Sequence, residues 1–309
     1  AAMLNLTAVS TSSLDTSIDE LKARITGLSS QDLTITESDG LVANGVTTTG
    51  GDITLKLDAG DLDIRANISG GDITLETTLG AMESNGGTVI GDDLVLTAHD
   101  SSSLNTSVTS LAGTVTKAAE TLTIRETNEL IIAAAGVSTN DGDITLNIGQ
   151  PGDYRRLTLV GDVNAGSGDI DLIARQTTGG GTFVADNLSV TLNTTSILNT
   201  NVTTLSGNIT DSRAGVQIYE ANDVQIGTAN LTAQGVASFL EIDAGGDLTE
   251  QRCGAGGGRQ GLHAPHAREK QRQRQLCRQR ERRRERHGGR QRPQPQLAAP
   301  LCAGVDLTE

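Results

Sequence analysis

The chain has 309 residues, a formal net charge of -14 and almost no aromatic side chains, the four being Tyr154, Phe183, Tyr219 and Phe239. A compact globular core normally draws much of its buried area from aromatic residues, so this composition argues against an ordinary globular domain. Residues 1–250 carry 10 Lys/Arg against 33 Asp/Glu and no cysteine, which argues against nucleic-acid binding and against disulfide stabilisation.

The first predicted elements are short β-strands that recur about every 20 residues. Each follows a Gly-Asp pair, after which apolar and polar residues alternate as in a half-buried strand. Glycine and aspartate both favour the turn that must precede such a strand. The regular copies occupy residues 51–55, 71–75 and 91–96, and less regular ones residues 60–64, 142–146, 161–163 and 168–172.

A unit of this size cannot bury its own apolar face, whereas stacked units bury a continuous core. The sequence therefore predicts an all-β fold for residues 1–250, a β-solenoid (β-helix) with coils of about 20 residues. Asp52, Asp72 and Asp92 would stack along the rod. The predicted inward side chains are Ile53, Leu55, Ile73, Leu75, Ile144 and Leu146, and the predicted outward ones are Thr54, Thr74 and Thr145.

A second period of about 90 residues relates residues 14–18, 104–108 and 198–202, and also residues 33–37, 122–126 and 216–220. Within it, Leu104, Val108, Leu111 and Val115 follow a 4-3-4 spacing that would also suit one face of a helix. The surrounding Thr, Ser, Val and Gly are weak helix formers, so we predict strands and turns there.

Two sets of residues resemble a known type of protein. Leu198–Thr210 and the Gly-Asp-Ile-Thr-Leu segments are similar to repeats of large bacterial surface proteins, the filamentous-haemagglutinin-like adhesins and related autotransported passengers. The resemblance covers about residues 1–250. It implies a right-handed parallel β-helix, export and display at the cell surface. The secretion-domain motif of that family is not visible in this sequence, so the resemblance does not extend to the export route.

Catalytic constellations are hard to find in residues 1–250. His99 is the only histidine there, and no nucleophile, zinc-spaced set or phosphate-binding loop accompanies it. Because some parallel β-helices cleave polysaccharides, a carbohydrate-active lyase or hydrolase stays as an alternative. Its nearest support is Arg155 and Arg156 beside Asp153 and Tyr154.

Calcium is the one cofactor that the sequence brings into consideration. Asp61 with Asp63, and Asp169 with Asp171, each place two carboxylates on one face of a strand. Calcium prefers such oxygen ligands and would relieve repulsion between stacked carboxylates. Aspartate as a turn former explains the same positions without metal, and the nonapeptide calcium repeat is absent.

Composition changes abruptly after Glu250. Residues 251–303 are rich in Arg, Gln and Gly, and the repeat resumes at residues 304–309, where Ala303–Glu309 matches Ala244–Glu250. We interpret residues 251–303 as an aberrant, disordered segment produced by a frameshift. The rival interpretation is a real basic tail that binds nucleic acid or an anionic surface. Translating the coding DNA in the other two frames tests this, and Gly-Asp repeats joining cleanly to Asp306 are expected.

Together these features predict a non-enzymatic, secreted or surface-displayed repetitive adhesin or structural protein, with no catalytic residue. A purely structural stalk without a ligand is a further alternative. The expected partners are host or cell-surface glycans or proteins, with neither nucleic acid nor a membrane span. The start of the chain lacks Met and a signal-peptide pattern, so we expect an internal piece whose export signal lies elsewhere.

Overall fold

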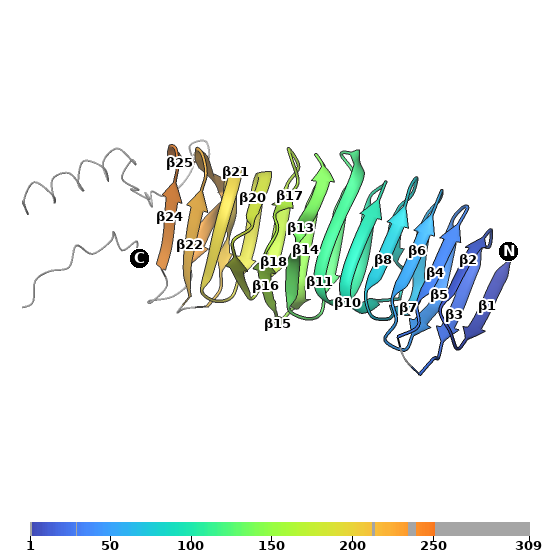
Figure 1. The fold of residues 1–309 in the computed structure, drawn as a ribbon. Helices are drawn as coiled ribbons and strands as arrows, with labels where there is room; N and C mark the ends of the chain where they lie inside the picture. Colours follow the sequence, from blue (N-terminus) through green and yellow to red (C-terminus); the bar gives the residue numbers. More distant parts are fainter. Residues whose placement is uncertain (1, 29, 212–213, 234–238, 251–309) are drawn as a thin grey trace, which may run out of the picture.

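The structure, a computed structural model, describes residues 2–28, 30–211, 214–233 and 239–250. Over these residues the chain winds into a rod of about 12 stacked turns, which runs from β1 at one end to β25 at the other (Figure 1). The predicted all-β solenoid is confirmed. The predicted frameshifted segment, residues 251–303, and the resumed repeat at 304–309 lie outside the described residues.

Neighbouring coils are joined almost entirely by parallel strand pairing. The described part of the chain contains no helix, and hence no helix that could span a membrane. In chain order the strands are β1 (Met3–Ala8), β2 (Ser12–Thr16), β3 (Glu20–Ile25), β4 (Leu33–Glu37), β5 (Leu41–Thr48), β6 (Ile53–Leu57), β7 (Leu62–Ser69), β8 (Ile73–Thr77), β9 (Met82–Ser84), β10 (Val89–Ala98), β11 (Ser102–Ala118), β12 (Leu122–Glu126), β13 (Leu130–Asn140), β14 (Ile144–Gln150), β15 (Asp153–Tyr154), β16 (Arg156–Leu159), β17 (Val163–Asn164), β18 (Ile170–Ala174), β19 (Gln176–Gly179), β20 (Thr182–Leu192), β21 (Ser196–Ile209), β22 (Gly215–Glu220), β23 (Val224–Ala233), β24 (Phe239–Ala244) and β25 (Leu248–Glu250).

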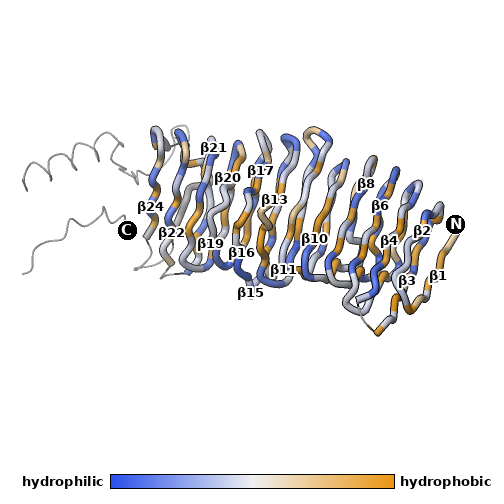
Figure 2. Tube along the Cα trace, viewed as in Figure 1, coloured by the Kyte–Doolittle hydropathy of each residue, from blue (hydrophilic) through white to orange (hydrophobic). Residues whose placement is uncertain are grey.

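Apolar side chains from every second position fill the interior of the rod. Ile53 pairs with Ile73 and Leu55 pairs with Leu75, and all four side chains are fully buried. Ile144 and Leu146 are buried in the same way, and the threonines between these residues are half-buried on the outer face. The predicted inward and outward positions are therefore confirmed. The alternation is visible along the tube in Figure 2.

The helix-like spacing of the long repeat arises from a corner within one strand. β11 runs without interruption, and Leu104, Val108, Leu111 and Val115 are all buried. Alternation holds as far as Val108, two outer residues follow at positions 109 and 110, and burial resumes at Leu111. The corner shifts the period-two pattern by one residue, which produces the 4-3-4 spacing. The prediction of strands is thus confirmed.

Coil length varies because the turns differ in length. Ile73 pairs with Leu94 of the next coil, and Leu94 in turn pairs with Leu111, which is a shorter step along the chain. The step from Ile144 to its partner Ile170 is longer than either, because a small hairpin is inserted between them. In that hairpin β14 and β15 pair antiparallel, the only such pairing among the described residues.

Candidate functional site

The aspartates of the Gly-Asp turns link each coil to the next. Oδ1 of Asp32 accepts the backbone N–H of Asp52 at 3.0 Å, and Oδ1 of Asp52 accepts the N–H of Asp72 at 3.0 Å. We call this repeated contact the aspartate ladder. The same contact joins Asp61 to Ala81, Asp143 to Asp169, Asp162 to Thr182 and Asp223 to Asp247.

The ladder continues through Asp93 and not through Asp92, so the predicted stacking of Asp92 is wrong. Oδ1 of Asp72 accepts the N–H of Asp93 at 3.3 Å, and Asp92 instead donates its N–H to the carbonyl of Gly71. The reason is the additional residue in this coil, which brings Leu94 and not Asp93 opposite Ile73. A strictly regular period could not reveal that insertion.

The first predicted calcium pair, Asp61 and Asp63, already has protein partners. Asp61 belongs to the aspartate ladder, and Asp63 accepts bonds from Arg65 Nε and from Asn85 Nδ2, both at 2.8 Å. Glu83 stacks directly on Asp63. Burial raises the pKa of Glu83, and the charges of Asp61 and Asp63 add to that rise while Arg125 opposes it.

The second pair, Asp169 and Asp171, lines an open depression of about 200 Å³ on the outer face, together with Asp143 and Asn187. Asp143 accepts the N–H of Asp169 at 2.9 Å, and Asp169 accepts a bond from Asn187 Nδ2 at 2.7 Å. The structure therefore brings one predicted pair into a carboxylate-lined hollow.

Within the described residues there is no group of three or more His, Cys, Asp or Glu arranged to hold a metal ion. The ladder supplies a structural role for Asp61 and Asp169, as expected of aspartate in a turn. Calcium at Asp61, Asp63, Asp169 and Asp171 stays a prediction, which a calcium titration of the purified chain would test.

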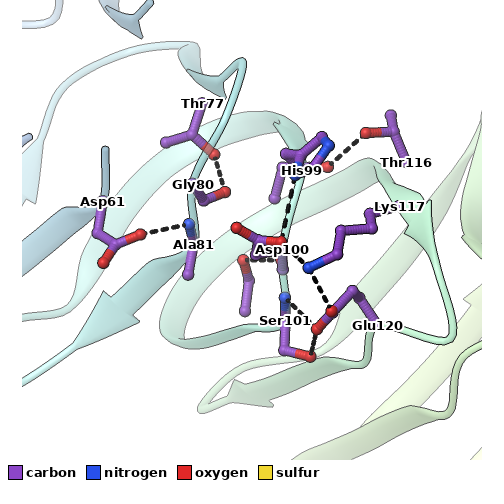
Figure 3. A network of polar contacts seen from close by, with 12 residues as sticks. Asp61, Thr77, Gly80, Ala81, His99, Asp100, Ser101, Thr116, Lys117 and Glu120 are labelled. Carbon is purple, nitrogen blue, oxygen red and sulfur yellow. Dashed lines mark hydrogen bonds and ion pairs between the residues drawn. The ribbon is translucent and has the colours of Figure 1, made fainter. Parts of the chain in front are cut away.

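A network of polar contacts surrounds His99, at the turn between β10 and β11 (Figure 3). Lys117 Nζ lies 2.6 Å from Asp100 Oδ1 and 2.8 Å from Glu120 Oε1. His99 Nδ1 lies 3.2 Å from Asp100 Oδ1, and Ser101 donates its hydroxyl to Glu120 at 2.5 Å. Sequence reasoning did not identify Lys117 and Glu120 as partners of this turn, although their distance from it along the chain is close to one coil.

The pKa shifts in this cluster favour ion pairs that hold the turn together over a catalytic role. The hydrogen bond to Asp100 raises the pKa of Lys117, and the bond from Lys117, followed by those from Ser101, lowers the pKa of Glu120 to about 2. The bond from Lys117 also lowers the pKa of Asp100. A general base works best with a pKa near the operating pH, so Glu120 is too weak a base to activate Ser101. All three groups are held in their charged forms.

Three buried glutamates recur at one position of the long repeat. Glu37, Glu126 and Glu220 are each at most 4% exposed. They pair in register with threonines of the preceding coil, namely Thr16 with Glu37, Thr106 with Glu126 and Thr200 with Glu220.

The carboxylate of each of these glutamates accepts backbone N–H groups at a bend, where a backbone carbonyl would otherwise accept them. Glu126 accepts the N–H of Val108 at 3.0 Å and the N–H of Asn128, in its own bend, at 2.7 Å. Glu37 and Glu220 accept comparable N–H groups from the preceding coil and from their own bends. Burial raises the pKa of Glu126 despite these donors. Sequence reasoning missed this role, although the Thr and Glu positions recur in all three copies of the repeat.

The inserted hairpin gathers the arginines that the sequence singled out. Arg155 lies 2.6 Å from Asp153, and Arg156 lies 2.5 Å from Glu129. The backbone N–H of Arg175, in the next coil, donates to the carbonyl of Arg155 at 2.7 Å. The structure thus places Tyr154 and three arginines at one corner of the rod.

Parallel coils, an apolar interior and a repeated inter-coil contact define this chain as a parallel β-solenoid repeat protein. Comparison with family models, curated proteins and solved structures gave no match.

Proposed function

We propose that this chain is the rod of a secreted or surface-displayed repetitive protein, adhesive or structural in role and without enzymatic activity. The observation that carries the proposal is the aspartate ladder, since an aspartate that recurs through the sequence joins each coil to the next. At about 4.8 Å per coil, about 12 turns make a rod of roughly 60 Å. Such a rod presents an elongated surface along a single axis.

The residues that catalysis could have used support the same proposal through their contacts. Lys117 forms ion pairs with both Asp100 and Glu120 at a turn, and Glu126 accepts two backbone N–H groups. Each contact stabilises the path of the chain from one coil to the next.

Surface display is tested on intact cells of the source organism with antibodies raised against the purified chain. We expect the antibodies to label intact cells or the culture medium, and external proteinase treatment to remove the cellular signal. Labelling that requires permeabilised cells would contradict the proposal.

The enzymatic alternative has one observation in its favour, the carboxylates of Asp143, Asp169 and Asp171 around an open depression. Glycosidases use pairs of carboxylates, one of them with a raised pKa. Asp169 and Asp171 both lie exposed on the outer face of the rod.

We expect the purified chain to produce no new reducing ends or unsaturated products from pectin, alginate or glycosaminoglycans. Asp169→Asn and Arg155→Gln are the diagnostic variants. Cleavage by the wild-type chain that either substitution abolishes would establish the enzyme in place of the rod.

A further inference from the structure

We propose that the corner formed by Tyr154, Arg155, Arg156 and Arg175, which we call the arginine corner, binds an acidic polysaccharide through the carboxylate or sulfate groups of the polymer. The inference rests on the proposed function, since it names the class of partner that an adhesive rod would take at this place.

The tip of the hairpin that carries this corner, residues 149–154, contributes no side chain to the buried apolar core. Gly149 pairs with Tyr154 and Gln150 with Asp153, away from the parallel ladders, and residues 150–153 are exposed. The hairpin lengthens the coil, yet residues 144–147 of β14 still pair in register with β18 of the next coil. Insertions that leave the core unchanged and project side chains outward are where binding functions concentrate.

Positive charge is concentrated at this corner. Three of the ten Lys/Arg residues in residues 1–250 lie there, in a stretch with 33 Asp/Glu. The backbone N–H of Arg175 bonds to the carbonyl of Arg155, so the two arginines occupy neighbouring positions on adjacent coils, whose backbones lie about 4.8 Å apart. Like charges so close repel each other. A polyanion across the two coils would relieve that repulsion.

The existing ion pairs leave the guanidinium groups accessible. The side chains of Arg155 and Asp153 are 43% and 68% exposed, and those of Arg156 and Glu129 are 47% and 58% exposed. Exposed pairs of this kind contribute little free energy, so a ligand can displace them. Among the described residues Arg175 has no ion pair.

The chemistry of the corner selects the class of polyanion. A guanidinium group binds carboxylate or sulfate through paired N–H donors, and the half-buried Tyr154 offers an apolar ring face to a sugar. Nucleic acids draw affinity from many phosphate contacts along a basic track. Three arginines between acidic ladders do not form such a track.

Binding of the full chain to immobilised alginate, which carries carboxylates, and heparin, which carries sulfates, is measured at low and high salt. Dextran is the neutral control and single-stranded DNA the rival class. We expect saturable binding to at least one acidic polysaccharide, weakened by salt, and none to dextran. Arg155→Gln with Arg175→Gln should lower the affinity by at least about tenfold, since both substitutions remove charge-assisted hydrogen bonds to the polymer.

Substituting the carboxylates that pair with these arginines gives a second test, because the affinity should change only if the arginines bind the polysaccharide. Asp153→Asn and Glu129→Gln remove competitors for the arginines, so each should raise the affinity about two- to fivefold. The matched control is Arg65→Gln, which removes an arginine paired with Asp63 elsewhere on the rod and should leave binding unchanged.

Circular dichroism of each variant serves as the control that its β-strands are retained. Equal loss on Arg65→Gln, no gain on Asp153→Asn, or tighter binding to DNA than to either polysaccharide would overturn the arginine corner. Those outcomes would leave the cell-labelling experiment untouched, so failure of the corner and failure of the proposed rod are distinguishable.

Discussion

Replacing Ile73 with Asp is expected to unfold several neighbouring coils and to cost about 4 kcal/mol or more. Ile73 is fully buried and lies between Ile53 and Leu94 of the adjacent coils. A carboxylate there would have neither water nor a partner, and such burial is among the most destabilising of single changes, at about 4 kcal/mol or above. Urea unfolding followed by far-ultraviolet circular dichroism measures the loss.

The control for this change is Thr74→Asp, one residue along the same strand. Thr74 lies on the outer face, so the new carboxylate would stay hydrated and should change the free energy of unfolding by less than about 1 kcal/mol. Equal destabilisation by the two substitutions would contradict the inward and outward assignment of β8. A dominantly helical spectrum of the unaltered chain would contradict the fold.

Replacing Glu126 with Ala is expected to destabilise the rod by about 1–3 kcal/mol, because the buried N–H of Val108 loses its acceptor. The N–H of Asn128 loses the same acceptor, but Asn128 lies in an exposed bend, where water can accept its hydrogen bond. Each unsatisfied buried donor costs about 1–3 kcal/mol. The matched control is Glu129→Ala in the same bend, which removes only an exposed ion pair worth about 0–1 kcal/mol.

Glu126 also makes a defined contribution to the pH dependence of stability. Burial raises its pKa above the ordinary value of 4.5, so the folded chain binds this proton more tightly than the unfolded chain. The contribution is fully present below the ordinary value and is lost as pH rises through the raised pKa. Glu126→Gln should therefore flatten the fall in stability on the alkaline side of that ordinary value. An unchanged pH profile would contradict the raised pKa.

Much of the fold could be predicted because period-two alternation and stacking leave few solutions for a sequence such as this. Ile53, Leu55, Ile144 and Leu146 could be assigned to the interior from their spacing alone. Even the helix-like run through Leu104 could be assigned to a strand, since its residue types outweigh its spacing.

The remainder could not be predicted because it depends on which turns lie above one another. An additional residue before Leu94 exchanged Asp92 for Asp93 in the ladder. Lys117 and Glu120 lie in one turn, and Lys117 meets Asp100 only because this turn lies above the turn of the preceding coil. Partners across coils follow from the sum of all intervening turn lengths, which a sequence pattern determines only approximately.

The aspartate ladder has a consequence for how such a protein can change over time. Each rung uses a carboxylate from one coil and a backbone N–H from the next, and no rung needs a particular neighbour beyond that. Duplicating or deleting a whole coil in frame would therefore leave every remaining rung with a donor and an acceptor. The reach of the rod becomes a matter of copy number, adjustable by unequal recombination between similar repeats without any redesign of the interior.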